Sequence, residues 1–312
     1  MNDKGGENMY EVLRDIPDFS KWTKIEQINK GWSQDRKYYV ENNENRKFLV
    51  RIAEATQYEA KEKEYQFLQK VNRIDAPMSR AIEFGKCQHN QFVYMVLTWV
   101  EGQSLNECLA NLSEDKQYAL GVDAGKLLKK IHQIKVAQED RHLQDRKERK
   151  LGGIAKYKLS PNRIPNDEPI IAFVEENIHL LNPYPSVYLH GDFHPGNMIL
   201  TPDNKLGIID FNRWKYGDQY EEFYKIQSFA RELSISFSKG QIDGYFEGKP
   251  TELFWKVLSV YVAHAALHSI VWAEKFGQEE VEGMKKRCFE ALEDYDYFER
   301  TVPKWYETAT TL

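Results

Sequence analysis

The sequence predicts an α+β protein of two unequal lobes, a small sheet-rich lobe followed by a larger, mainly helical one. In about the first 100 residues, runs rich in Tyr, Val, Phe and Ile are separated by turn residues, as in β-strands. After Gly102, apolar residues recur at helical spacing over much of the chain. The chain has 312 residues, 41% of them hydrophobic, which is enough to bury a sizeable core.

The small lobe is expected to begin with a β-hairpin and a helix. Residues 37–40 and 46–52 are strand-like and flank the turn-forming run Asn42-Asn43-Glu44-Asn45. Residues 58–71 follow with apolar side chains among charged ones, which predicts a helix.

The connection between the lobes is predicted at the end of a buried strand. Residues 92–100 are a continuous apolar run, typical of a strand covered on both faces. We therefore expect a hinge at about 97–102, a sheet-rich domain over 1–100 and a helical domain over 103–312.

The larger lobe contains two clear helical regions and one region with few structural signals. Apolar periodicity predicts a long helix over about 116–134 and further helices from about 218 onward. Residues 138–168 are polar, with Gly152-Gly153 and two prolines, so we expect a loop or an exposed insertion there. The most apolar stretch, 257–273, falls short of the roughly 20 residues that span a bilayer and is expected to be a buried helix.

Charge and cysteine content exclude several classes of protein. The 43 basic and 48 acidic residues give a formal net charge of -5, which argues against a nucleic-acid-binding protein. The cysteines are three, widely spaced and without a CxxC pair, which indicates neither a disulfide framework nor a zinc site. The N-terminus lacks the pattern of a signal peptide. We expect a cytoplasmic protein without an obligate protein partner.

The segment most informative about chemistry is His190-Gly191-Asp192-Phe193-His194-Pro195-Gly196-Asn197, followed by Asp210 after an apolar run. Phosphoryl transfer from a nucleotide needs a carboxylate that orients the acceptor hydroxyl, and oxygen ligands that hold Mg²⁺ against the phosphates. Protein kinases supply these groups with an Asp and an Asn in one loop and a second Asp downstream. Asp192 and Asn197 have the same separation as in that loop.

This loop, with Ile208-Ile209-Asp210-Phe211 and Tyr216-Gly217-Asp218 downstream, resembles that of the aminoglycoside phosphotransferase and choline kinase superfamily, which reads H-G-D-x-x-x-x-N. Lobe order and length are also similar, so the resemblance covers most of the chain. It implies a bilobal protein-kinase-like fold and an enzyme that uses Mg²⁺ and ATP or GTP to phosphorylate a hydroxyl group. Antibiotic resistance is a biological role that such a resemblance implies.

The resemblance also implies roles for individual residues of the larger lobe. Asp192 is similar to the catalytic carboxylate that takes the proton of the acceptor hydroxyl, and Asn197 and Asp210 are similar to the metal ligands. His190 and His194 are expected to support the loop rather than to act as bases.

In the small lobe the resemblance implies a strand cation that meets the nucleotide phosphates and is held by a carboxylate on a helix. Strand 48–52 offers Arg51 where many family members have Lys, and the helix offers Glu64, with Glu62 as a weaker candidate. Arg keeps the charge and can bind phosphate bidentately. The alternative is that Arg51 is a surface strand residue.

Two further nucleotide contacts are implied. Ser33, in the polar loop 31–35, resembles a residue of the phosphate-covering loop, although a plain hairpin turn explains this loop nearly as well. Backbone groups of Thr98 and Val100 would hydrogen-bond the purine edge at the hinge.

The acceptor is expected to be a small, hydroxylated and cationic molecule, an aminoglycoside or a related metabolite. The acidic, aromatic segment 290–299 could hold such a cation, or it could be a solvated helix face with an aromatic core stripe. Choline or another amino alcohol, a macrolide and a sugar are alternative acceptors, and a nucleotide-binding pseudoenzyme is an alternative outside the enzyme class. A protein kinase is disfavoured because Asp210-Phe211-Asn212 lacks the glycine of D-F-G.

Overall fold

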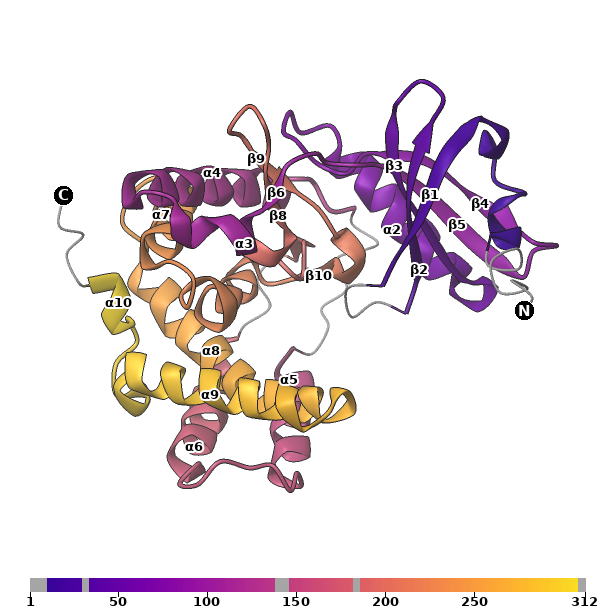
Figure 1. The fold of residues 1–312 in the computed structure, drawn as a ribbon. Coiled ribbons are helices and arrows are strands. Elements are labelled where there is room, and N and C mark those ends of the chain that lie inside the picture. The colour runs from indigo at the N-terminus through magenta and orange to yellow at the C-terminus, as the bar shows by residue number, and fades with distance from the viewer. Residues whose placement is uncertain (1–9, 30–33, 138–145, 182–185, 308–312) are drawn as a thin grey trace. The chain divides into compact units, whose positions relative to one another are not determined.

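The computed structural model describes residues 10–29, 34–137, 146–181 and 186–307 (Figure 1). The chain divides into two compact units. The sheet unit comprises Met1–Gln103 and Ile199–Arg213, and the helical unit comprises Ser104–Met198 and Trp214–Leu312. A sheet-rich part followed by a larger helical part is therefore confirmed. Asp210 belongs to the sheet unit, although the sequence-based division put it in the second domain.

The sheet unit is built on five antiparallel strands with one helix, α2 (Tyr58–Val71). The strand order is β1-β2-β3-β5-β4. The strands are β1 (Trp22–Ile28), β2 (Arg36–Asn42), β3 (Lys47–Glu54), β4 (Ala81–Cys87) and β5 (Phe92–Thr98). The predicted hairpin is formed by β2 and β3, and Asn42 closes its turn by accepting hydrogen bonds from the N–H groups of Glu44 and Arg46. The predicted helix over 58–71 is confirmed.

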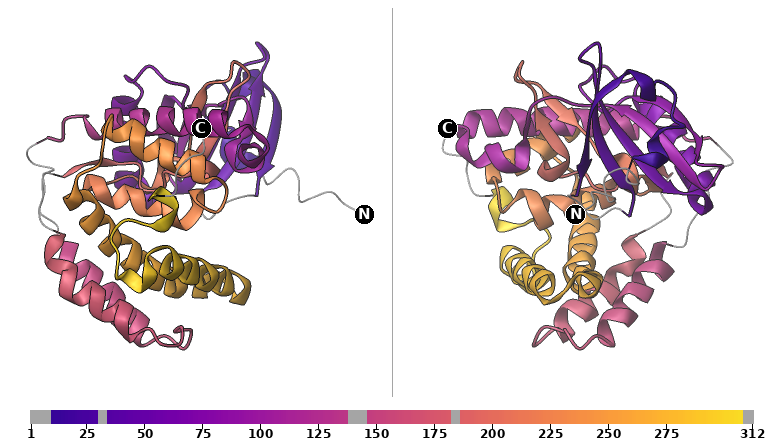
Figure 2. Two further views of the ribbon diagram at one scale, coloured as in Figure 1. Left: turned by 90° about the vertical axis from the view of Figure 1, so that its left-hand side faces the viewer. Right: turned by 45° about the vertical axis from the view of Figure 1, so that its right-hand side comes forward.

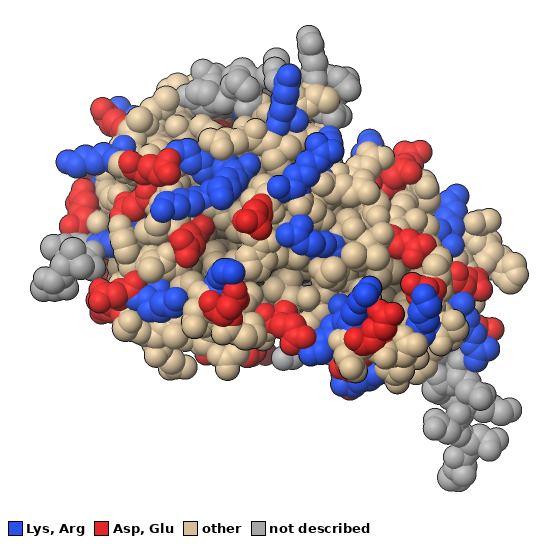
Figure 3. All heavy atoms as spheres, turned by 90° about the horizontal axis from the view of Figure 1, so that it is seen from above, with Lys and Arg blue, Asp and Glu red and all other residues tan. Residues whose placement is uncertain are grey.

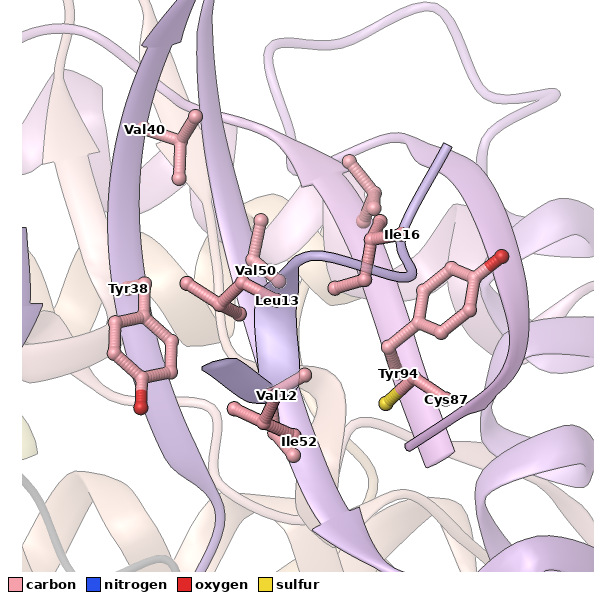
Figure 4. Packing of buried hydrophobic residues seen from close by; sticks show 10 residues of the cluster. Val12, Leu13, Ile16, Tyr38, Val40, Val50, Ile52, Cys87 and Tyr94 are labelled. Carbon is pink, nitrogen blue, oxygen red and sulfur yellow. The ribbon is translucent and has the colours of Figure 1, made fainter. Parts of the chain in front are cut away.

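The two faces of this sheet differ because side chains alternate along each strand. On one face, Val50 and Ile52 pack with Val12, Leu13 and other buried apolar residues (Figure 4). On the other face, Arg51 meets Glu64 of α2. The apolar face stabilises the sheet by removing hydrocarbon from water, while the opposite face of the same strand carries a buried charge.

Asp210 is positioned by a short sheet that includes β6 (Gln103–Ser104), β8 (Met198–Leu200) and β9 (Leu206–Ile208). Within the sheet unit, β9 is held to the rest by a parallel bridge between Met78 and Ile208. The Thr201 hydroxyl organises the β8–β9 turn, since it donates to Asp203 and accepts from the Lys205 N–H. Asp210 follows directly after β9 and Ile209.

The helical unit contains eight α-helices among its described residues, together with a two-stranded antiparallel sheet. The sheet pairs β7 (Val187–Leu189) with β10 (Lys215–Gly217). The helices are α3 (Leu105–Cys108), α4 (Glu114–His132), α5 (Arg146–Lys158), α6 (Glu168–Asn177), α7 (Ile235–Phe246), α8 (Glu252–Ala273), α9 (Gln278–Asp294) and α10 (Lys304–Glu307). The long helix predicted over about 116–134 is α4.

Helices α4 and α7 lie side by side and approach closely through glycines (Figure 1). A Cβ atom at Gly121 or Gly125 of α4 would lie 2.2 or 2.1 Å from a backbone oxygen of α7. A Cβ atom at Gly240 or Gly244 of α7 would lie 2.3 or 2.2 Å from a backbone oxygen of α4. Such distances are far inside van der Waals contact, so only glycine permits this packing.

The prediction of a loop or exposed insertion over 138–168 is wrong for most of the described part. Residues 146–158 form α5 and α6 begins at Glu168, while 138–145 lie outside the described residues (Figure 2). Both glycines of Gly152-Gly153 lie within α5, and Gly153 has a packing role. A Cβ atom there would lie 2.6 Å from His264 Nε2, so glycine lets α5 pack against α8.

Helix α8 forms the centre of the helical unit, with α5, α6 and α9 packed around it. Among the described residues, Glu252–Phe276 is the one segment long and apolar enough to cross a membrane. Its most apolar window is 72% buried inside the structure, as expected for a core helix. The prediction of a buried helix over 257–273 is confirmed.

Surface charges of both signs are intermixed on the face shown in Figure 3.

Candidate active site

The loop 190–197 joins β7 to β8 and is held by hydrogen bonds within itself. His190 is fully buried, and its Nδ1 accepts a hydrogen bond from the Asp192 N–H at 3.2 Å. The ring of His190 also packs edge-on against Phe193. Gly191 has φ 81°, a left-handed conformation that glycine adopts without strain. These contacts give His190 the supporting place that the sequence analysis expected.

Asp192 lies at the bend of this loop with two donors on the same carboxylate oxygen. Lys225 Nζ is 2.6 Å from Asp192 Oδ1, and His194 Nε2 is 3.5 Å from it. Burial raises the pKa of Asp192, but the hydrogen bond from His194 and the charge of Lys225 outweigh burial and hold this pKa well below its usual value. Asp192 is therefore ionised at neutral pH and can accept a hydrogen bond from a hydroxyl group.

His194 contacts Asp192 in a defined tautomer. Its Nδ1 accepts a hydrogen bond from the Gly196 N–H at 3.1 Å, so a neutral ring carries its proton on Nε2. That nitrogen is the one that faces Asp192. His194 thus serves the carboxylate as a donor, and its ring stacks on Phe229 at 4.8 Å between centroids.

Asn197 is fixed by the backbone of the same loop. Its side-chain N–H group donates to the carbonyl oxygen of Asp192 at 2.9 Å. This bond engages the amide nitrogen and leaves the amide oxygen as the atom that could bind a metal ion. Asp192 and Asn197 are therefore brought together as the sequence predicted.

Asp210 lies in the sheet unit and has φ 62°, an uncommon conformation for a residue other than glycine. Its carboxylate Oδ2 is 3.5 Å from Lys37 Nζ on β2. The next residue, Phe211, packs edge-on against Phe67 of α2. Among the described residues, no group of three or more His, Cys, Asp and Glu side chains could hold a metal ion.

An Asn oxygen and an Asp carboxylate are nevertheless of the hard type that suits Mg²⁺, which takes few protein ligands and completes its shell with water and phosphate oxygens. The chemistry of Asn197 and Asp210 therefore fits Mg²⁺.

Arg51 on β3 is buried and paired with two carboxylates. Its Nη1 donates to Glu64 of α2, and its Nε donates to Asp35 Oδ2 at 3.0 Å. Lys61 of α2 completes the cluster, since its Nζ is 2.7 Å from Asp35 and 3.3 Å from Glu64. Burial raises the pKa of Asp35, but the charges of Arg51 and Lys61 hold it below its usual value. The cluster is thus two cations and two carboxylates, with the Arg51, Asp35 and Glu64 side chains 4% exposed and that of Lys61 13% exposed.

The structure shows how deeply Arg51 is buried and which of the two predicted carboxylates is its partner. The alternative that Arg51 is a surface residue is wrong, because its side chain is 4% exposed. Glu64 is its partner, whereas Glu62 accepts a hydrogen bond from Tyr58. Ser33 lies outside the described residues.

The predicted hinge residue Thr98 ends β5 and bonds to the chain segment before β4. The Thr98 N–H donates to the carbonyl oxygen of Arg80, and the Thr98 hydroxyl accepts from the Arg80 N–H, both at 2.9 Å. Of the two Thr98 backbone groups, the carbonyl is thus the one that could meet a nucleobase. Val100 follows beyond β5, and its side chain would lie 3.0 Å from a Cβ atom at Gly207.

Sequence reasoning missed four charged residues around these groups: Asp35, Lys37, Lys61 and Lys225. Lys61 is three residues before Glu64 on α2, so helical spacing could have placed it on the same face. Lys37 could have been found from the register of the hairpin, in which it lies opposite Arg51. Lys225 has no such local signal, because it meets Asp192 across 33 residues of chain.

The chain combines a β-sheet unit that holds a buried strand-to-helix ion pair with a helical unit that holds an Asp–Asn loop. Together these features define the kinase-like class of phosphoryl-transfer folds. A sequence model of the phosphotransferase enzyme family matches residues 24–255. This chain belongs to that family. It is therefore a phosphotransferase. No curated protein matched the sequence.

Solved structures of aminoglycoside phosphotransferases share the fold. A GDP complex of aminoglycoside 2'-phosphotransferase-IIIa is 14% identical with a TM-score of 0.71, covering 93% of this chain and 98% of that chain. A gentamicin complex of APH(2")-IIa is 17% identical with a TM-score of 0.64, covering 96% and 99%. A thermostable variant of APH(4)-Ia, in ternary complex with ADP and hygromycin B, is 14% identical with a TM-score of 0.65, covering 91% and 98%.

Proposed function

We propose that this protein is a small-molecule kinase that transfers the γ-phosphate of ATP or GTP to a hydroxyl group of an aminoglycoside or a related cationic metabolite. The observation that carries the proposal is the ionised Asp192 carboxylate, fixed in one loop with Asn197. The similar folds that bind ADP, GDP, gentamicin or hygromycin B support both the nucleotide and the class of acceptor.

In this proposal the protein mainly positions and stabilises charge, as the loose transition state of phosphoryl transfer requires. Asp192 accepts the hydrogen bond of the acceptor hydroxyl and takes its proton. The acceptor oxygen bonds to the γ-phosphorus as the bond from that phosphorus to the nucleoside diphosphate breaks, and the diphosphate leaves. Arg51, held by Glu64, faces the nucleotide phosphates, and the backbone of Thr98 and Val100 meets the base. Ser33 would contribute to the phosphate site. When bound to Asn197 and Asp210, Mg²⁺ would neutralise phosphate charge.

The acidic segment 290–299 contributes less to acceptor binding in this proposal than its composition suggests. Glu290 and Asp294 pair with Arg231, and Asp296 pairs with Lys304 and Arg300. These carboxylates are balanced within the fold, so a cationic acceptor would gain little from them. Glu221, another acidic residue of the helical unit, is buried and likewise pairs with Lys150 and Lys215.

The test is a coupled assay of nucleoside diphosphate release with Mg²⁺ and either ATP or GTP, run with aminoglycosides, choline, amino alcohols, macrolides and sugars. We expect release to rise with an aminoglycoside and to fall by several orders of magnitude in Asp192→Ala, while nucleotide binding is preserved. Stimulation by another class would correct the acceptor. Equal release by the wild type and Asp192→Ala under every condition would refute the kinase mechanism and favour a nucleotide-binding pseudoenzyme.

A further inference from the structure

One helical segment, residues 218–230, contacts the loop 190–197 with three side chains in succession. The Glu222 carboxylate accepts a hydrogen bond from the Gly191 N–H at 2.9 Å. Lys225 Nζ is 2.6 Å from Asp192 Oδ1, and the Phe229 ring stacks on that of His194 with an interplanar angle of 28°. The spacing of three and then four residues places these side chains on one side of the segment.

The segment is itself firmly anchored, so it can serve as a support. Asp218 caps its start by accepting a hydrogen bond from the Tyr220 N–H, and its second oxygen accepts one from the Tyr261 hydroxyl, both at 2.9 Å. Glu221 accepts hydrogen bonds from Lys150 and Lys215, also at 2.9 Å each. A π-helical turn follows over Ile226–Ala230, a geometry often found at functional sites.

The Lys225 ammonium is confined by two aromatic rings as well as by Asp192. The residue is 6% exposed, and its Nζ lies 5.0 Å from the centre of the Phe229 ring and 5.2 Å from that of Tyr224. A lysine confined in this way loses the rotamer freedom that makes most exposed ion pairs weak. The contact between Lys225 and Asp192 is therefore a defined one.

Lys225 and His194 approach the same oxygen of Asp192, but they do so unequally. The lysine contact of 2.6 Å is a short charge-assisted hydrogen bond, whereas 3.5 Å to His194 is long for a hydrogen bond. Lys225 is thus the stronger restraint on the rotation of the carboxylate.

We propose that Lys225 is a positioning residue for phosphoryl transfer, which holds Asp192 through Oδ1 in the orientation that receives the acceptor hydroxyl. This inference rests on the proposed function of Asp192. Lys225 acts through Asp192 and is not assigned a contact with either substrate. Misplacing a reacting group by about 1 Å can cost on the order of 10²-fold in rate, so the expected effect of removing Lys225 is of that size.

The test compares Lys225→Met, which keeps the length of the side chain without its charge, with Lys225→Arg, which restores the charge. Lys129→Met is the matched control, because Lys129 makes a 2.6 Å ion pair with Glu247 in the same unit away from the loop. Asp192→Ala defines the rate that depends on Asp192. Diphosphate release from Mg²⁺–ATP is measured with water alone and with gentamicin, streptomycin and hygromycin B, to give kcat and the KM for ATP.

We expect Lys225→Met to lower the Asp192-dependent kcat by about 10²-fold with KM for ATP changed by less than about threefold. Lys225→Arg should recover part of the loss, and Lys129→Met should match the wild type. If Lys225→Met does not fold, Lys225→Gln is measured in its place. A wild-type kcat in the folded Met or Gln variant, with Asp192→Ala impaired, overturns the role of Lys225 alone. Absence of any Asp192-dependent rate overturns the proposed function and the inference with it.

Discussion

Lys37 of β2 lies directly opposite Arg51 of β3 in the sheet register. Directly opposed residues of antiparallel strands project on the same face, so the two cations share the face that α2 covers. Lys37 Nζ is 3.5 Å from Asp210 Oδ2, and Arg51 is bound to Glu64 and Asp35. Two strand cations and the proposed metal ligand Asp210 thus belong to one side of the sheet unit.

Replacing Lys37 by Met should weaken nucleotide binding. Because Lys37 shares its sheet face with Arg51, we expect it to act as a second cation beside the phosphates. A hydrogen bond to a charged group contributes about 1.5–3 kcal/mol. The expected rise in Kd is roughly 10- to 100-fold. Isothermal titration calorimetry with Mg²⁺ and a non-hydrolysable ATP analogue measures it. Lys24→Met is the control, because Lys24 forms exposed pairs on β1. An unchanged Kd for Lys37→Met would remove Lys37 from the phosphate site.

Replacing Arg51 by Met should destabilise the protein. The change leaves the carboxylates of Asp35 and Glu64, each with a side chain only 4% exposed, with Lys61 as the remaining cation of the cluster. Breaking a buried ion pair in this way costs about 3–5 kcal/mol. Arg51→Lys should cost less, because it keeps the charge but cannot reach both carboxylates with a planar fork.

Urea unfolding followed by circular dichroism measures these free energies. Arg46→Met is the comparison, since the Arg46 side chain is 71% exposed and should change stability by less than about 0.5 kcal/mol. Equal stabilities for Arg51→Met and Arg46→Met would show that the cluster contributes nothing to stability.

The sequence was sufficient to predict features that depend on local pattern and spacing. The separation of Asp192 and Asn197 identified a loop in which the two residues are hydrogen-bonded. The apolar run over 92–100 identified β5, which lies between β3 and β4. Each of these predictions depends only on residues that are close together in the sequence.

Features that depend on contacts between distant elements were not predicted. Gly152-Gly153 looked like a helix breaker, because nothing in the local sequence reveals that His264 of α8 occupies the space a side chain at Gly153 would need. Lys225 has no signal in the local sequence, because the contact with Asp192 exists only once the segment 218–230 packs on the loop 190–197. Tertiary packing decides both cases.

Stability should fall as the pH drops below about 6.5, the ordinary pKa of histidine in an unfolded chain. Burial, followed by repulsion from Lys150 and His268, holds the pKa of His264 well below this value in the folded protein. The unfolded state then binds a proton that the folded state does not, so the loss begins at the unfolded pKa. It continues, at up to about 1.4 kcal/mol per pH unit, until the folded pKa is reached.

Chemical unfolding between about pH 7 and pH 5 tests this prediction, because the unfolded-state pKa values of Asp and Glu lie lower. His264→Asn should reduce the slope, leaving the smaller part due to His268, whose pKa is also lowered by burial. The exposed His179 gives the control His179→Asn, which should keep the wild-type slope. A slope for His264→Asn equal to that of the wild type would assign the effect to other groups.

Alanine at Gly121 should destabilise the protein strongly, and alanine at Gly152 should stabilise it. The Cβ atom of Gly121→Ala would lie 2.2 Å from the carbonyl oxygen of Phe237, so α4 and α7 must move apart. Overpacking of a core typically costs about 1–3 kcal/mol, and here backbone rather than a flexible side chain must shift.

Gly152 is also within a helix, but a Cβ atom there meets nothing within 4 Å. Alanine should then gain roughly 0.5–1 kcal/mol from helix propensity. Melting temperatures of the two variants should therefore move in opposite directions from the wild type. A rise for both variants would mean that helix propensity outweighs the contact of α4 with α7, and a fall for both would contradict the expected gain at Gly152.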